Sequence, residues 1–152
     1  MSGTGRIALI TGAGSGIGRA ASLALAARGL SVVLVGRTES TLCETADHVL
    51  SAYVGVRTLV VPCDVSKSEE VSRMRDRVVA EMGTPDVLVN NAGVVARASV
   101  EDTTDADWSQ VLGVNLDGTF FVTRAFLPAM RDRKSTRLNS SHSTLSRMPS
   151  SA

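Results

Sequence analysis

Short apolar segments alternate with amphipathic stretches along the first 130 residues. The apolar segments are Arg6–Thr11, Ser31–Gly36, Arg57–Pro62 and Asp86–Asn90. Each has the length and the nearly continuous apolar character of a strand buried on both faces. Between them, apolar residues recur at helical spacing, as in Ile17, Ala21, Ala24 and Leu25, and again in Val71, Met74, Val78 and Met82. The pattern predicts strands and helices in alternation, and therefore a parallel sheet with right-handed crossovers.

The ends of the predicted helices carry recognisable signals. Gly29 and Gly83 each stand shortly before the next apolar segment, where a helix C-cap is expected. Ser66, with Glu69 three residues later, has the spacing of a capping box and predicts a helix that begins there.

A last helical stretch, Asp105–Met130, follows the fourth strand, and no strand follows it. The predicted fold is therefore an α/β, doubly wound parallel sheet that is truncated after the fourth strand and its following helix. In this stretch Trp108, Leu112, Asn115, Thr119 and Val122 share one face. We expect Trp108 to lie in the core and Asn115 to need hydrogen-bond partners. Gly113 and Gly118 flank Asn115, and each costs about 1 kcal/mol against alanine in a helix, which predicts a local distortion there.

Composition limits the kinds of protein that this chain could be. It has 152 residues, about the length of one domain. With 43% hydrophobic and 20% charged residues it is not a disordered chain, and a net charge of +1 gives no case for binding nucleic acid or an anionic membrane. No apolar run approaches the roughly 20 residues of a membrane span. No signal-peptide pattern opens the chain, so a cytoplasmic location is expected.

The cysteines and histidines do not indicate a metal site. Cys43 and Cys63 form neither a disulfide framework nor a metal-ligand spacing, and we expect two buried thiols. His48 and His142 also lack a ligand spacing. No metal is predicted.

The texture of the chain changes at Asp132. Residues 132–152 hold seven serines in 21 residues and show no strand or helix periodicity. One interpretation is a disordered serine-rich tail. Another is translated read-through, because codons for Asp132–His142 and Ser146–Ala152 can be written as a widely used sequencing-library adapter. We therefore predict an incomplete domain over residues 1–131 and a non-native or disordered tail over 132–152. The encoding DNA tests the adapter hypothesis, and without the tail 12 basic and 14 acidic residues give a net charge of −2.

A glycine-rich segment, Thr11–Gly18 (TGAGSGIG), joins the first strand to the first predicted helix. Glycine allows a tight turn and close approach to a pyrophosphate, which the N–H groups and dipole of the helix N-terminus bind. A purely structural turn is the alternative, but this position favours a dinucleotide site. A second motif, Asn90–Gly93 (NNAG), ends the fourth strand beside the first, at the switch point where such sheets bind ligands.

The order of these motifs resembles the short-chain dehydrogenase/reductase family, classical type. The resemblance covers residues 5–131 and includes Asp64-Val65 after the third strand and Asn115 within Gly113–Leu116. It implies a Rossmann-type, NAD(P)-binding fold and a set of site residues. The pyrophosphate and adjoining ribose would be bound by Gly12, Gly14, Ser15, Gly16, Ile17 and Gly18. Asp64 and Val65 would bind the adenine, and the nicotinamide side would be lined by Asn91, Ala92 and Gly93.

Some of these residues have a plain structural alternative. Asp64 could serve only as a cap or turn residue. For Asn90 we favour a role in joining neighbouring strands. The family resemblance implies that Asn115 supports a water-linked proton relay to a catalytic lysine, and the alternative is a structural asparagine satisfied by backbone groups.

The residue after the second strand bears on the choice of cofactor. An NAD site usually has an acid about 20 residues beyond the glycines. Here the second strand ends at Gly36 and Arg37 follows. A guanidinium suits the 2′-phosphate of NADP, so NADP(H) is favoured over NAD(H). If Arg37 is merely a solvated loop residue, the preference stays open.

The reaction of this family needs residues that this chain does not place where they belong. The resemblance implies a serine on the next strand and a Tyr-x-x-x-Lys pair on the next helix. The single tyrosine, Tyr53, has Arg57 four residues on and precedes the third strand; the lysines are Lys67 and Lys134. We therefore expect an inactive cofactor-binding half that exposes apolar surface at Phe120, Phe121 and Phe126.

The parent protein is expected to be an oxidoreductase that acts on a small-molecule carbonyl/alcohol pair, similar to 3-oxoacyl-carrier-protein reductases. We also expect it to be a homo-oligomer through the 105–130 helix. The alternatives are a non-catalytic NAD(P)-binding sensor and a methyltransferase, whose fold also has a glycine-rich first turn. The Asn90–Gly93 motif and the Gly12–Gly18 spacing argue against the methyltransferase.

Overall fold

The predicted strands form one parallel sheet. In the computed structural model, which describes residues 5–138, these strands are β1 (Ile7–Thr11), β2 (Ser31–Gly36), β3 (Thr58–Pro62) and β4 (Val87–Val89). The strand order is β3-β2-β1-β4, and β1 pairs in parallel with both β2 and β4. The chain therefore reverses its direction of winding after β3 and returns to the other side of β1. This confirms the doubly wound sheet, with its switch point between β1 and β4.

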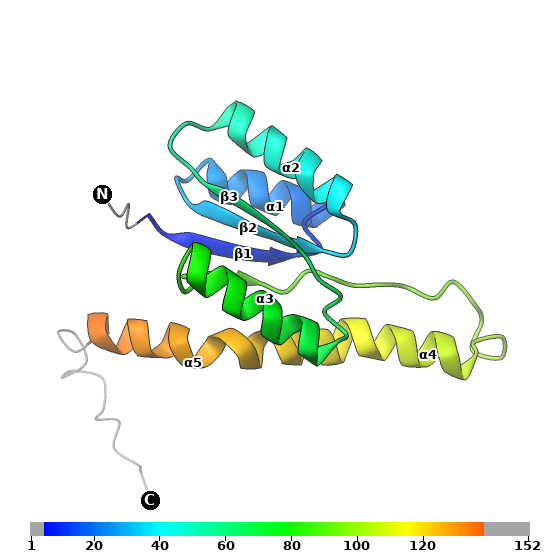
Figure 1. Cartoon of the computed structure of the whole chain (residues 1–152). Helices are drawn as coiled ribbons and strands as arrows, with labels where there is room; N and C mark the ends of the chain where they lie inside the picture. Colours follow the sequence, from blue (N-terminus) through cyan, green and yellow to red (C-terminus); the bar gives the residue numbers. More distant parts are fainter. Residues whose placement is uncertain (1–4, 139–152) are drawn as a thin grey trace, which may run out of the picture.

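Helices cover both faces of the sheet (Figure 1). The helices are α1 (Gly16–Ala26), α2 (Glu39–Ala52), α3 (Ser68–Glu81) and α5 (Gly118–Leu138). Because side chains alternate along a strand, Ile7 and Leu9 of β1 pack in the core with α3 and α5, whereas Ala8 and Ile10 pack in the core with α1 and α2. The sheet is thus buried on both sides, as its apolar strands predict.

The predicted helix ends are correct in part. Gly29 and Gly83 have φ values of 77° and 100°, a backbone conformation that favours glycine, and both follow a helix closely. The predicted capping box at Ser66 is wrong. Helix α3 begins at Ser68 with Lys67 as its N-cap, which makes no side-chain capping bond. The Ser66 hydroxyl donates to Asp64 Oδ1 at 2.7 Å, and Ser66 lies one residue before the N-cap.

The distortion predicted near Asn115 is present. Helix α4 (Asp105–Leu112) continues into a π-helix, η1 (Gly113–Asp117), before α5 begins. The N–H of Gly118 donates to the carbonyl of Gly113, five residues back, which is the π spacing. Helix α4 starts with a capping box between Thr104 and Asp107. The predicted single helix is therefore three consecutive segments.

Burial on this last helical stretch differs from the expectation. Trp108 is 60% exposed, so its predicted place in the core is wrong. Helix α4 has no buried residue and extends past the end of the sheet in Figure 1, which explains the exposure. Phe120 is 56% exposed as expected, but Phe121 is half-buried and Phe126 is 1% exposed, packed in the core with α3.

The two cysteines also differ from each other. Cys63 is buried at the end of β3, whereas Cys43 is exposed on α2, so the expectation of two buried thiols is half wrong. Cys63 packs in the hydrophobic core beside the sheet, whereas Cys43 lies outside it.

The segment predicted to be a tail is helical where it is described. Helix α5 continues to Leu138, and residues 139–152 lie outside the described residues. Arg133 pairs with Asp86 at 3.3 Å and donates a hydrogen bond to the carbonyl of Thr84. Whether the natural sequence ends near Arg131 stays a prediction. Among residues 5–138, no helix has the length and apolar character needed to span a membrane.

Candidate dinucleotide site

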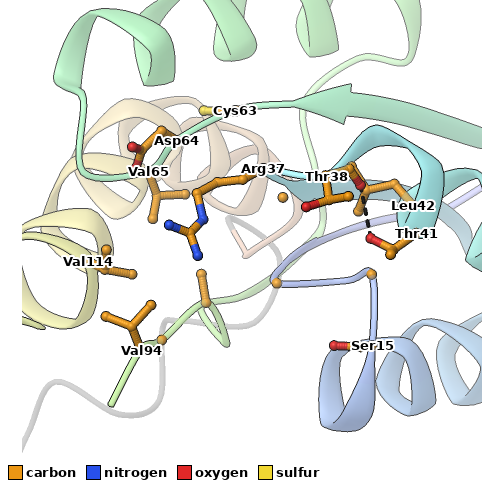
Figure 2. Close-up of a pocket in the computed structure, with 15 residues that line it drawn as sticks. Ser15, Arg37, Thr38, Thr41, Leu42, Cys63, Asp64, Val65, Val94 and Val114 are labelled. Carbon is orange, nitrogen blue, oxygen red and sulfur yellow. Dashed lines mark hydrogen bonds between the residues drawn. The ribbon is translucent and has the colours of Figure 1, made fainter. Parts of the chain in front are cut away.

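A cavity lies at the carboxyl ends of the strands (Figure 2). Its lining comes from the segments that follow β1, β2, β3 and β4, together with η1. The lining residues are Gly12, Gly14, Ser15, Gly36, Arg37, Thr38, Thr41, Leu42, Cys63, Asp64, Val65, Ala92, Gly93, Val94 and Val114. Doubly wound sheets bind their ligands at this position.

The structure brings most of the predicted site residues together. Those that line the cavity are Gly12, Gly14, Ser15, Arg37, Asp64, Val65, Ala92 and Gly93. The predicted residues that do not line it are Gly16, Ile17, Gly18, Asn91 and Asn115. Ile17 is 79% exposed at the start of α1. Sequence reasoning missed the first turn of α2, although its position directly after Arg37 at the end of β2 would have indicated it.

The glycine-rich loop needs glycine for space as well as for conformation. Gly12 has a φ of 65°, and a Cβ there would stand 2.9 Å from Asn91 Nδ2 and 3.0 Å from the Cα of Ala92. A Cβ at Gly18 would overlap the carbonyl oxygen of Gly12. Ser15 is the N-cap of α1, and its side chain makes no capping hydrogen bond to the N–H groups of the first turn. The loop therefore forms a cradle of the kind that binds phosphate.

Asn91 joins this loop to β4. Its N–H donates to Thr11 Oγ1 at 3.0 Å, and its Nδ2 donates to the carbonyls of Thr11 at 3.0 Å and Gly12 at 3.3 Å. The strand-joining role favoured for Asn90 is therefore wrong, because Asn90 Nδ2 donates instead to Thr123 Oγ1 of α5. The two asparagines point to opposite neighbours, as adjacent residues at a strand end do.

Asp64 closes a turn at the end of β3. Its Oδ1 accepts hydrogen bonds from the Ser66 N–H at 3.0 Å and from the Ser66 hydroxyl at 2.7 Å. Burial alone would raise the pKa of the Asp64 carboxyl, but the Ser66 hydrogen bonds, with Arg37 and Lys67 nearby, hold it below its ordinary value. Asp64 is thus an ionised acceptor at the cavity wall, and a turn residue at the same time.

Arg37 brings positive charge into the cavity. It follows Gly36, the last residue of β2, and its exposed side chain lines the cavity, extending toward Val65 and Val114 in Figure 2. Glu39 is the nearest carboxylate along the chain, in the first turn of α2, and it does not line the cavity. The charge that the strand end of β2 presents to a ligand is therefore positive.

Cys63 also lines the cavity. The sequence predicted it to be a buried thiol but did not place it at the site. Burial, followed by the charges of Glu70 and Asp64, raises the pKa of the Cys63 thiol to about 12. The thiol is therefore protonated at neutral pH and contributes an apolar wall. The alternation of side chains along β3 is the signal that could have placed it.

Asn115 has the hydrogen-bond partners that its position in the sequence required. Its Oδ1 accepts from the Val94 N–H at 2.8 Å, and its Nδ2 donates to the Val94 carbonyl at 3.0 Å. The π-helix is thereby fixed to the segment after β4, which lines the cavity. These contacts show that backbone groups of Val94 satisfy the Asn115 amide, as in the structural alternative. The role of Asn115 in a proton relay stays a prediction. Across residues 5–138, no group of three His, Cys, Asp or Glu side chains is arranged to hold a metal ion.

Comparisons with known proteins identify the family of the chain. A family model described as short chain dehydrogenase matches residues 6–152. The chain belongs to the short-chain dehydrogenase family. Its relatives in this family are oxidoreductases, among them (5R,7aS)-5-hydroxy-7a-methyl-1-oxo-2,3,5,6,7,7a-hexahydro-1H-indene-carboxyl-CoA reductase of Mycobacterium tuberculosis. That reductase is 40% identical over 129 residues, which cover 84% of this chain and 49% of the reductase.

Solved structures of short-chain dehydrogenases have the same fold. L-sorbose reductase from Gluconobacter frateurii, complexed with NADPH and L-sorbose, matches with a TM-score of 0.80 at 34% identity, covering 85% of this chain and 49% of that one. A 3-ketoacyl-ACP reductase from Sinorhizobium meliloti matches with a TM-score of 0.78 at 38% identity, covering 84% and 49%. This chain spans about half the length of the curated relatives it matches, from 49% to 57% for three of them.

Proposed function

We propose that this chain is the cofactor-binding half of an NADP(H)-dependent oxidoreductase that interconverts a carbonyl compound and an alcohol. The observation that carries the proposal is the cavity at the switch point between β1 and β4, with a glycine cradle on one side and Arg37 on another. The loop can pack in this conformation only with glycine at positions 12 and 18, because a Cβ at either would clash with neighbouring loop and strand-end atoms. A glycine loop of this kind before a helix N-terminus is suited to a pyrophosphate. A bound nicotinamide cofactor supplies or accepts hydride in such reactions.

Each predicted site residue has a proposed task in holding the cofactor. The pyrophosphate and ribose would be bound at the loop by Gly12, Gly14, Ser15, Gly16, Ile17 and Gly18. Asp64, kept ionised by Ser66, would accept a hydrogen bond from the adenine amino group beside Val65. Asn91 holds the β4 end against the loop, which places Ala92 and Gly93 along the cavity. For Asn115 we propose a positioning role in proton relay, because it fixes η1 to Val94.

The preference for NADP(H) over NAD(H) rests on Arg37. A guanidinium that binds a 2′-phosphate makes charge-assisted hydrogen bonds, for which about 1.5–3 kcal/mol is typical. The L-sorbose reductase complex with NADPH supports the same preference at the level of a relative. We expect Arg37→Asp to weaken NADPH binding at least about tenfold more than NADH binding.

Fluorescence titration of each cofactor against the whole chain measures this difference. Arg28→Asp is the matched control, because it makes the same charge change on an exposed residue beyond the C-terminus of α1 and away from the cavity. Equal losses for NADPH and NADH in Arg37→Asp would refute the assignment. Binding of neither cofactor by the unaltered chain would refute the proposed function as a whole.

We propose that the substrate is a small carbonyl or alcohol, with the 3-oxoacyl type supported by the similarity to the 3-ketoacyl-ACP reductase. We further propose that this chain alone is inactive. Tyr53, its single tyrosine, packs with the α1 and α2 core and not at the cavity. The expected result is NADPH binding without ketone-dependent NADPH oxidation, and measurable turnover by the chain would contradict this.

The remaining proposals concern the whole protein. We propose a cytoplasmic homo-oligomer that contacts its copy through the 105–130 helix, whose outer face exposes Trp108, Leu116 and Phe120. Sedimentation of a full-length version tests the oligomer, and a monomer would argue against it. We also keep the proposed division into a domain of residues 1–131 and a tail of residues 132–152, which sequencing of the encoding DNA tests.

A further inference from the structure

Arg19 connects the glycine-rich loop to helix α2. It lies in the first turn of α1, and its guanidinium donates both to backbone carbonyls and to side chains of α2. Its Nη2 lies 2.6 Å from the carbonyl oxygen of Gly14 and 3.4 Å from that of Thr41, and its Nε lies 3.0 Å from Thr45 Oγ1. The side chain is only 26% exposed despite its charge. An arginine is suited to this position because its planar group donates in several fixed directions at once.

Thr45 completes the connection from the side of α2. The residue is fully buried, and its Oγ1 lies 3.0 Å from the carbonyl oxygen of Ala13. Its Oγ1 also accepts the hydrogen bond from Arg19, and the Thr41 carbonyl, one turn back in α2, lies 3.1 Å away as a second acceptor for the same hydroxyl proton. Two successive carbonyl groups of the loop, those of Ala13 and Gly14, are therefore bound by side chains that α1 and α2 contribute.

These contacts determine the orientation of the loop amides. In a planar trans peptide, the C=O of one residue and the N–H of the next point in opposite directions. Holding the carbonyls of Ala13 and Gly14 against Arg19 and Thr45 therefore turns the N–H groups of Gly14 and Ser15 away from those side chains. Both Gly14 and Ser15 line the cavity. The same contacts hold α2, whose first turn forms another wall of the cavity.

We propose that Arg19 and Thr45 are positioning residues that hold the glycine-rich loop in its anion-binding conformation. This inference rests on the proposed function, since it assigns the loop a pyrophosphate ligand. Arg19 also pairs with Glu44 at 2.9 Å, but Glu44 is 60% exposed. Such an exposed ion pair contributes little, so the bonds to the loop and to Thr45 carry the effect.

Three variants separate these contributions. Arg19→Lys keeps the charge but cannot reach Gly14 and Thr45 with a planar group. Thr45→Val removes the hydroxyl at nearly the same shape, and Thr45→Ser retains it. Glu44→Gln is the control, because it removes only the exposed ion pair. Circular dichroism of each variant verifies that the fold is kept.

The first measurement is amide hydrogen exchange of the segment 12–18 in the free chain. We expect faster exchange in Arg19→Lys and Thr45→Val, and exchange at the original rate in Thr45→Ser and Glu44→Gln. This measurement needs no cofactor. It therefore decides whether the two residues hold the loop even if the chain binds no dinucleotide.

The second measurement compares the dissociation constants of NADPH and adenosine 2′-monophosphate, which lacks the pyrophosphate. We expect Arg19→Lys and Thr45→Val to weaken NADPH about tenfold, as the loss of one charge-assisted hydrogen bond would, and to leave the monophosphate within about twofold. Equal weakening of both ligands would show a merely structural role and overturn the proposal. Unchanged exchange and unchanged NADPH affinity would overturn it as well, whereas an unaltered chain that does not bind NADPH would overturn the proposed function.

Discussion

Replacing Gly18 with alanine tests whether the close packing of the glycine-rich loop is needed for stability. Gly18 is the third residue of α1 and is buried. An added Cβ would overlap the carbonyl oxygen of Gly12 and would stand 2.7 Å from Asn91 Nδ2. These two atoms are joined by a hydrogen bond of 3.3 Å. The new methyl group would therefore have to separate them or push α1 outward.

The size of the effect follows from three contributions. Alanine is better than glycine inside a helix by about 1 kcal/mol. Forcing a methyl group into a packed site costs about 1–3 kcal/mol, and the loss of one hydrogen bond of Asn91 costs about 1 kcal/mol. The free energy of unfolding should therefore fall by about 1–3 kcal/mol in Gly18→Ala.

Urea unfolding followed by far-ultraviolet circular dichroism measures this change. Fluorescence is the weaker probe, because the single tryptophan, Trp108, is 60% exposed in the folded chain. Gly113→Ala is the matched control. Its Cβ would meet only Ser66 Cβ at 3.7 Å, an ordinary contact, so this variant should be neutral or up to about 1 kcal/mol more stable. The reasoning fails if Gly18→Ala is as stable as the unaltered chain, or if Gly113→Ala loses as much.

Three further predictions follow from burial and charge. Phe126→Ala should lower the free energy of unfolding by about 3–5 kcal/mol because the ring is fully packed, whereas Phe120→Ala should change it by less than about 1 kcal/mol; similar losses in urea unfolding would contradict the assigned core. A thiol reagent should label Cys43 quickly and Cys63 only after unfolding, because the Cys63 thiol is buried and has a pKa of about 12. Mass spectrometry of the labelled chain measures this, and rapid labelling of both cysteines would contradict it. The lowered pKa of the Asp64 carboxyl stabilises the folded chain at pH values above the ordinary pKa of 3.8, and this stabilisation is lost as the pH falls through the lower pKa of the folded state. The difference in free energy of unfolding between the unaltered chain and Asp64→Asn should therefore shrink on acidification. A difference that does not change with pH would refute this.

The sequence predicts features that depend on local chemistry. Gly113 and Gly118 around Asn115 predicted a distortion because glycine weakens a helix and an amide needs partners, and the π-helix is there. The parallel sheet was expected from the alternation of strands and helices, and the place of the fourth strand beside the first from the doubly wound arrangement. The expectation for Trp108 failed because the helical pattern shows which residues share a face, but not how far that face extends over the sheet.

Contacts between side chains far apart in the sequence could not be predicted in the same way. The hydrogen bond from Arg19 to Thr45 joins residues 26 positions apart and depends on how α1 and α2 pack. No spacing rule encodes that packing. Ser66 shows a limit at short range as well, because its hydroxyl donates to Asp64 in a local turn and the helix begins only at Ser68. The cavity itself was predictable, since the ends of parallel strands meet at one edge of the sheet.

The wide turn of η1 acts as an inserted residue in the long final helix. A π turn holds one residue more than an α turn, and one residue of α-helix corresponds to a rotation of about 100°. The turn from Gly113 to Gly118 therefore sets the phase between the faces of α4 and α5. In evolutionary terms, loss of a single codon within 113–117 would restore a regular helix while rotating α4 about its axis. A deletion at Leu116 or Asp117 would turn Asn115 together with α4 relative to α5 and break its contact with Val94. This segment must therefore preserve the direction in which each side chain points as well as the helix itself.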